Sequence, residues 1–226
     1  MNRLIRRILQ VTGFCLTFII NPYSQSVDFK ALINRSDSLI YAGKFTECYK
    51  MLSAIPDDNA LYPDEHRLAA RLNHNTGICL GELGKFQQAI DRFKAAEKEY
   101  LVENSRDSLL GELYLNLGEI FLYLNADSVF FYADKIPAVF GPDKVIAGRA
   151  LSLRAFMEIY KEDYGAAKKH FEAAKEIFKR LLPENAFEYS DFYAKYADYC
   201  RRIGDLYNLE LYSKQALNIF LMYKPL

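Results

Sequence analysis

The residues that could perform acid–base, nucleophilic or metal chemistry are few and widely spaced. Histidine occurs three times, at His66, His74 and His170, and no His-Glu-x-x-His or Cys-x-x-Cys pattern accompanies any of them. A metal site needs ligands whose spacing brings them to one ion. Serine-hydrolase elbows, phosphate-binding loops and dinucleotide-binding glycine patterns are also absent from the sequence. We therefore expect no catalytic residue, no metal and no cofactor, and an enzyme is the weakest of three functional hypotheses.

Three cysteines lie beyond the N-terminal segment, at Cys48, Cys79 and Cys200. An exported protein that depends on a disulfide framework has an even, closely spaced set of cysteines. Scattered cysteines on apolar helical faces are typical of small buried hydrophobic residues, which is the expectation here. The alternative is a disulfide between Cys48 and Cys79 on neighbouring helices.

The first 26 residues have the features of a secretory signal peptide. Three arginines precede an apolar stretch at residues 8–20, which is shorter than the ~20 residues that span a bilayer. Ser24 and Ser26 supply small residues before a cleavage point. We expect residues 1–26 to be removed, leaving a domain at 27–226 without a membrane span. Retention of the segment as an anchor is the alternative.

Charge excludes one class of partner. Without the first 26 residues the chain has 26 basic and 29 acidic residues, and no run of lysine or arginine exceeds two. Nucleic-acid binding depends on clustered basic side chains that neutralise phosphates. We therefore expect no nucleic-acid partner.

The predicted helices, which must position any functional side chains, occur as a pattern that repeats along the chain. The clearest unit covers residues 72–100 and contains two predicted helices, with Gly77 in the first and Phe93 in the second. A small residue lets two helices approach closely, and a glycine between them supplies the left-handed conformation that ends the first. Corresponding turn positions are 41, 41, 37 and 42 residues apart. They are Gly43, Gly84, Asn125, Glu162 and Gly204.

The unit resembles the tetratricopeptide repeat, whose pattern has aromatic-x2-Leu-Gly-x2-Tyr, then Ala-x3-Phe, then a helix-ending proline. Tyr114, Leu117, Gly118 and Phe121 reproduce the first half, and Pro137 is the expected end of that unit's second helix. The resemblance implies an all-α, right-handed superhelical solenoid of about five TPR-like helical hairpins. A nonrepetitive helical bundle is the alternative.

Such a solenoid has a concave groove lined by the first helix of each hairpin. Helical periodicity assigns these residues to the groove: Ile33, Asp37, Arg71, His74, Ile78, Leu115, Glu119, Ser152, Phe156, Ala194 and Asp198. Tyrosines also recur near the ends of first helices, at Tyr41, Tyr123 and Tyr160. Tyrosine suits peptide recognition because its ring offers apolar area and a hydroxyl. Packing of these rings against the following helix is the alternative.

The last predicted helix begins near Leu206 and is apolar on more than one side. Leu209, Ala216, Leu217 and Phe220 suffice to pack it against the preceding helices, and a terminal repeat normally has a polar outer face. We therefore predict an interface, with a homodimer as one form of it, from the residues left over: Leu211, Tyr212, Ile219, Met222 and Tyr223. The alternative is that Tyr212 and Tyr223 cover the same core.

The resemblance implies a non-enzymatic scaffold of the periplasm or cell envelope that binds a peptide or protein partner in the groove. An extracytoplasmic sensory module of a signalling system is the alternative function. Asn34, Asn75 and Asn116 recur at 41-residue intervals, as in repeats that clamp a carboxylate. The lysines of such a clamp are not in register beside them, so the resemblance does not extend to that mode of binding.

Mass spectrometry of the protein from its native host tests the export prediction. We expect the mature chain to begin near Val27, because signal peptidase cuts after a small residue such as Ser26. A mature protein that retains Met1 would contradict the prediction.

Overall fold

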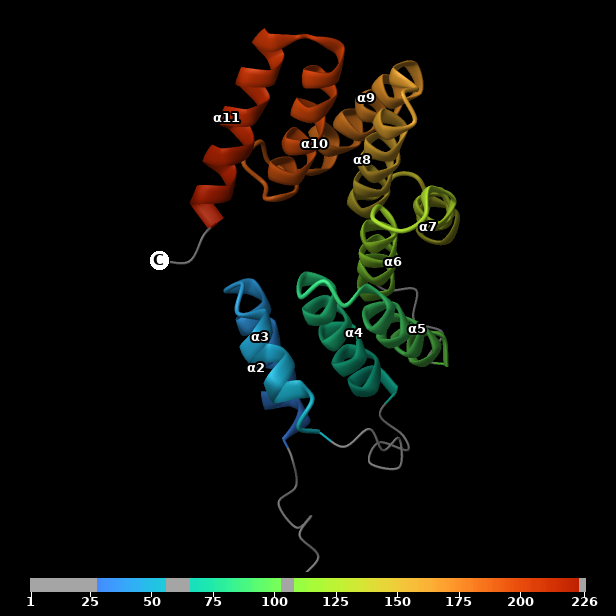
Figure 1. Cartoon of the computed structure of the whole chain (residues 1–226), viewed down its shortest axis with the longest axis vertical. Helices are drawn as coiled ribbons and strands as arrows, with labels where there is room; N and C mark the ends of the chain where they lie inside the picture. The colour runs from blue at the N-terminus through green and yellow to red at the C-terminus, as the bar shows by residue number, and fades with distance from the viewer. Residues whose placement is uncertain (1–27, 56–65, 103–107, 224–226) are drawn as a thin grey trace, which may run out of the picture.

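The computed structural model describes residues 28–55, 66–102 and 108–223, and within these ranges it has ten helices and no strand (Figure 1). The helices are α2 Phe29–Tyr41, α3 Phe45–Leu52, α4 His66–Glu82, α5 Phe86–Val102, α6 Ser108–Phe121, α7 Ala126–Phe140, α8 Val145–Tyr160, α9 Tyr164–Leu181, α10 Glu188–Ile203 and α11 Leu206–Tyr223. The all-α class is confirmed. The predicted signal peptide lies outside the described residues.

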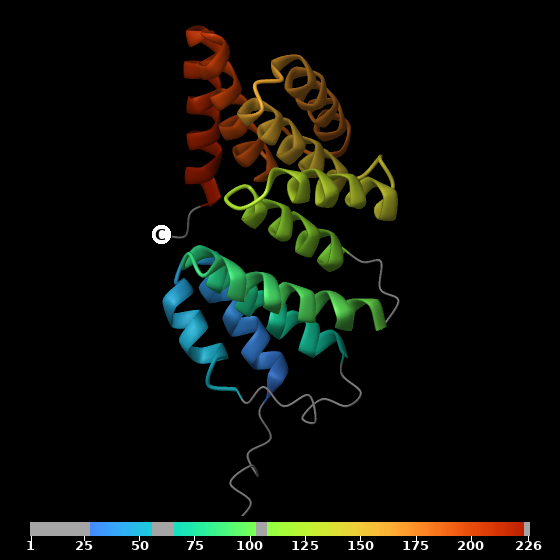
Figure 2. The same cartoon turned by 45° about the vertical axis from the view of Figure 1, so that its right-hand side comes forward.

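Consecutive helices pack in pairs that follow one another through space in chain order (Figures 1 and 2). The first helices of the pairs also contact each other, α2 with α4, α4 with α6, α6 with α8 and α8 with α10. This arrangement is that of a helical solenoid. The number of true repeats and the hand of the superhelix stay predictions. No helix in the described part of the chain is both long and apolar enough to cross a membrane.

The turns within pairs follow the predicted positions, with one exception. Gly43, Gly84 and Gly204 have φ values of 69°, 72° and 80°, in the left-handed region, and Glu162 has φ 60° at the equivalent place. Asn125 does not take this conformation; its φ is −159°, and its side chain accepts hydrogen bonds from the first backbone amides of α7. Asparagine is a favoured N-cap residue, so the turn of this pair has a helix cap without the left-handed residue of the others.

The predicted end of the second helix at Pro137 is wrong. Helix α7 continues to Phe140 and ends at Gly141, whose φ is 90° and whose N–H donates to the Pro137 carbonyl. Proline lacks the N–H that would donate to the carbonyl four residues earlier, and its ring crowds that carbonyl. Near the end of a helix this loss does not stop the last turn, and glycine terminates it.

Glycines on first helices allow the second helices to pack against the bare backbone. A Cβ atom at Gly77 would lie 2.5 Å from Cε1 of Phe93, a ring on α5. At Gly148 the Phe178 ring of α9 would lie 2.6 Å from an added Cβ. At Gly118 the obstacle is Leu153 of the next first helix, at 2.7 Å. These positions are packing sites, since any side chain there would force the helices apart.

The stack curves until its two ends meet. The Tyr41 hydroxyl at the end of α2 donates a 2.6 Å hydrogen bond to the carbonyl of Tyr223 at the end of α11. Figures 1 and 2 both show the end of α11 returning towards α2 and α3. The first helices α4, α6, α8 and α10 therefore line the concave, hollow side of the stack.

Substitution of the packing glycines should weaken the fold. We expect Gly77→Ala and Gly118→Ala each to lower the free energy of unfolding by about 1–3 kcal/mol, because the new methyl group overlaps a ring or a leucine. The control is Gly165→Ala on α9, where the nearest neighbour of an added Cβ is an exposed carboxylate oxygen at 3.7 Å. This change should be neutral or stabilise by about 0.5–1 kcal/mol. Urea titration measures all three, and equal effects would contradict the packing role.

Candidate functional site

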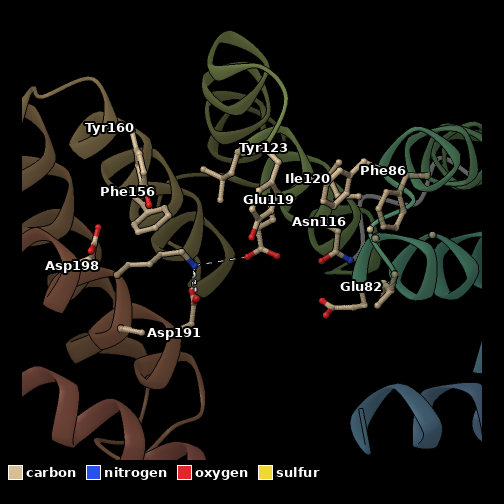
Figure 3. A pocket seen from close by; sticks show the side chains of 18 residues that line it. Glu82, Phe86, Asn116, Glu119, Ile120, Tyr123, Phe156, Tyr160, Asp191 and Asp198 are labelled. Atoms are coloured by element: carbon tan, nitrogen blue, oxygen red, sulfur yellow. Dashed lines mark hydrogen bonds and ion pairs between the residues drawn. The ribbon is translucent and has the colours of Figure 1, made fainter. Parts of the chain in front are cut away.

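The first helices form a pocket of about 780 Å³ on the hollow side of the stack (Figure 3). Its walls come from α4, α6, α8 and α10, with the start of α5 at one edge. These helices are distant in the chain and meet only because successive pairs stack. The volume lies within the ~300–1,000 Å³ typical of ligand sites.

Two aromatic pairs form opposite parts of the wall. Tyr123 stacks on Phe86 with ring centroids 5.2 Å apart and planes 4° from parallel. Phe156 packs edge to face on Tyr160, also at 5.2 Å. Tyr123 is 73% exposed and Tyr160 53% exposed, so their rings face the solvent-filled pocket. Both belong to the recurrent tyrosines of the sequence, whereas Tyr41 lies outside the pocket and joins the chain ends.

The floor of the pocket is rich in carboxylates. Glu82, Glu119, Asp191 and Asp198 line it, and Lys195 is the single basic residue in the described part of the lining. Lys195 forms an ion pair with Asp191 and lies 3.9 Å from a carboxylate oxygen of Glu119 (Figure 3). Its side chain is only 11% exposed. Sequence reasoning missed Lys195, although its position four residues after Asp191 is a recognisable helical ion-pair spacing.

The electrostatics of the floor follow from its concave shape. Glu119 keeps 43% of its side chain exposed, yet surrounding protein removes much of its hydration. This desolvation raises the pKa of the Glu119 carboxyl, and the nearby ammonium of Lys195 opposes the rise. Asp198 pairs with Arg201, and its second oxygen, buried and without a hydrogen bond, lies 3.9 Å from Nε of Arg202.

In the structure, nine of the eleven predicted groove residues fall into two groups, and Asp37 and Arg71 form a third. Those that line the pocket are Ile78, Glu119, Phe156, Ala194 and Asp198. Those whose side chains are buried in the helix stack are Ile33, His74, Leu115 and Ser152. For this second group the expectation of a groove-facing side chain needs correction. Each first helix packs on the next first helix as well as on the second helix of its own pair. More of its circumference is therefore buried than in an isolated hairpin of two helices.

His74 is buried between helices and does not face the groove. The amide Nδ2 of Asn116 donates to His74 Nε2 at 2.9 Å, so the ring proton is on Nδ1, which lies 3.4 Å from the Tyr100 hydroxyl. Phe93 packs edge to face against the same ring. Burial lowers the pKa of His74 to about 4, and the positive charge of Arg71 adds to this effect. The imidazole is therefore a neutral link between α4, α5 and α6.

The recurrent asparagines and Arg71 also act within the chain. Asn75 donates 2.7 Å hydrogen bonds to Ser36 Oγ and to Asp37 Oδ1, which joins α4 to α2. Arg71 forms an ion pair with Asp37 between the same two helices. Asp37 and Arg71, which were predicted to face the groove, therefore bind each other at one end of the hollow, away from the pocket lining.

The other two histidines bind single carboxylates. Nδ1 of His66 lies 2.7 Å from Glu99, and Nδ1 of His170 lies 2.8 Å from Glu158. In the ranges that the structure describes, no three His, Cys, Asp or Glu side chains gather as a metal site would require.

The residues predicted to form a C-terminal interface also fall into two groups, buried and exposed. Ile219 is buried in the hydrophobic core, and Tyr212 packs against that core and the Tyr193 and Tyr196 rings. Leu211, Met222 and Tyr223 remain exposed. So do two residues expected to pack inward, Leu217 and Phe220, together with Leu206, Tyr207 and Leu221. The outer face of α11 is therefore apolar, but the residues that form it differ from those predicted. Association of two copies through this face stays a prediction.

Comparison with known proteins adds no relative. The chain matches no model of a known protein family, and no curated protein sequence is similar to it. The resemblance to tetratricopeptide repeats thus stays a prediction.

The neutral state of His74 predicts an acid-dependent loss of stability. The unfolded chain binds a proton near pH 6.5 and the folded protein only near pH 4, so stability is full above pH 6.5 and falls as the pH drops to 4. We expect this one group to account for about 3 kcal/mol of that fall. Urea titrations at several pH values should show a shallower fall in His74→Gln. Gly165→Ala, which changes no titratable group, is the control and should keep the fall of the natural protein; equal falls in all three proteins would contradict the prediction.

Proposed function

We propose that this chain is a non-enzymatic scaffold of tetratricopeptide type that binds a segment of a peptide or protein partner in the pocket between α4, α6, α8 and α10. The observation that carries the proposal is the pairing of exposed aromatic rings with carboxylates along one concave surface. Aromatic side chains and a few positioned polar groups are what recognition sites use for affinity and orientation.

The aromatic pairs favour a peptide over a purely ionic partner. The Phe86–Tyr123 and Phe156–Tyr160 pairs present ring faces and edges that can cover aliphatic or aromatic side chains. Each pair also holds its exposed tyrosine in place before binding, so little side-chain entropy is lost when a partner arrives.

The polar groups between the rings suit a peptide backbone. Asn116 and Glu119 lie on the same helix, one turn apart, and face the pocket. The Asn116 amide, which uses one N–H on His74, and the Glu119 carboxylate can together donate to and accept from the main chain of an extended segment. Lys195 does not offer a free positive charge, because two carboxylates already neutralise it.

Export would place this binding in the cell envelope. The arginines and short apolar stretch at the N-terminus support this location, and the acidic balance of the remaining chain agrees with a protein rather than a nucleic-acid partner.

Affinity capture tests the proposal. The chain at residues 27–226 is immobilised, envelope extract of the native host is passed over it, and retained proteins are quantified by mass spectrometry. We expect a specific partner whose recovery falls by about tenfold or more in Tyr123→Ser and Phe156→Ser, because aromatic residues at the centre of a contact contribute most of its free energy.

The matched control is Phe131→Ser, which removes an exposed aromatic ring of α7 that lies outside the pocket. Recovery should match that of the natural chain, and circular dichroism should show the same helix content in all variants. A partner retained equally by the pocket variants and the control would contradict binding in the pocket.

A further inference from the structure

Two cysteines that take no part in the pocket lie against each other in the N-terminal part of the stack. Cys48 is on α3 and Cys79 is on α4, and both are fully buried in one hydrophobic cluster. Each thiol affects the pKa of the other, as only groups that lie near one another do. Cys48 Sγ also lies 3.7 Å from the Ser36 carbonyl oxygen on α2. The helices that carry the two cysteines are in direct contact.

The surroundings do not fit a catalytic or metal-binding thiol. Reactive cysteines lie beside lysine, arginine or protonated histidine, which stabilise the thiolate. The charged groups nearest to these thiols are instead carboxylates, Asp37 and Glu47 for Cys48 and Glu82 for Cys79. Burial raises the pKa of both thiols, and the carboxylates raise it further. What the site offers is a second thiol in the same buried cluster.

We propose that Cys48 and Cys79 form an intramolecular disulfide that joins α3 to α4 when a disulfide oxidant such as oxidised glutathione is present. The two thiols share one buried cluster on helices that contact each other, so bonding requires the two sulfur atoms to approach to the ~2.05 Å of a disulfide. Cys200, on α10, belongs to a different hydrophobic cluster and has no cysteine neighbour among the described residues.

The exchange proceeds in two balanced steps. One cysteine loses its proton and attacks oxidised glutathione, which breaks the glutathione disulfide and releases one glutathione thiolate. The second cysteine loses its proton and attacks the cysteine sulfur of the mixed disulfide, which releases the other glutathione thiolate. The two cysteines are oxidised by two electrons, glutathione disulfide is reduced, and the two protons end on the released thiols.

Burial determines when this exchange occurs. The raised pKa values leave almost no thiolate in the folded protein, and neither sulfur is accessible to glutathione. The bond therefore forms while α3 is docking on α4, before the cluster closes. Once formed, it is shielded from reductants by the same burial.

The bond would strengthen the weakest end of the stack. Among the described helices, α2 and α3 pack on each other and on α4, with Tyr41 adding one hydrogen bond to the far end of the chain. A terminal pair in a solenoid has a neighbour on one side only and opens most readily. A disulfide into α4 ties this pair to the helix that forms one wall of the pocket.

Peptide mapping tests the bond. The reduced, unfolded chain is refolded with reduced and oxidised glutathione, the folded fraction is isolated, free thiols are alkylated in denaturant, and trypsin is added without reductant. We expect peptide 45–50 linked to peptide 72–85, and peptide 196–201, which contains Cys200, alkylated. Alkylation of Cys48 and Cys79 in the folded fraction would overturn the proposal.

Thermal melts provide the second measurement. The oxidised natural chain should melt higher than its reduced form by about 5 °C, because the cross-link restricts the unfolded state. Cys200→Ser should show the same difference, and Cys48→Ser should show none. An equal melting temperature for the oxidised and reduced natural chain would overturn the stabilising role of the bond.

Discussion

The contact of a phenylalanine ring with a helix backbone that carries no side chain is the constraint on which the rest of this structure depends. Phe93 rests on α4 at Gly77, and Phe178 rests on α8 at Gly148. A methyl group at either glycine would overlap the ring, so the spacing between the two helices of a pair is set by this contact. The spacing in turn sets how far each pair extends and where the next first helix can lie. Gly118 allows the same close contact between neighbouring first helices, with Leu153 as the packed side chain.

The close spacing of first helices explains why polar side chains connect them. Asn75 binds residues of α2, Asn116 binds His74 on α4, and Arg149 binds Glu112 on α6. Buried amides and a neutral imidazole need partners, because an unsatisfied polar group in a core costs about 1–3 kcal/mol. Each link thereby holds one first helix in register with the next. The pocket side chains project from the same helices, so these links also fix the positions of the pocket side chains relative to one another.

The two ends of the stack differ in how they end. At one end α2 and α3 lie against α4, with a buried pair of thiols at the contact. At the other end α11 buries Ala216 and Ile219 but leaves a row of leucines, aromatic residues and a methionine in solvent. A helix that is apolar on its outer face usually has a further contact to make. The Tyr41–Tyr223 hydrogen bond joins the two ends of the stack.

The periodic apolar residues, the small residues and the glycine turns were sufficient to predict the paired helices, because they act through contacts within one or two turns of helix. The same local rules placed the pocket residues Ile78, Glu119, Phe156, Ala194 and Asp198 on the correct faces. They could not show that His74, Leu115 and Ser152 are buried, or that Ile219 reaches the core while Leu217 does not. Those outcomes depend on how each first helix packs on the next and on the angle at which α11 meets α10. Such angles arise from contacts among residues about 40 positions apart, which no single helix encodes. Only the tertiary structure brings Glu119 of α6 near Lys195 of α10 and places Cys48 of α3 in one buried cluster with Cys79 of α4, because each pair joins different helices.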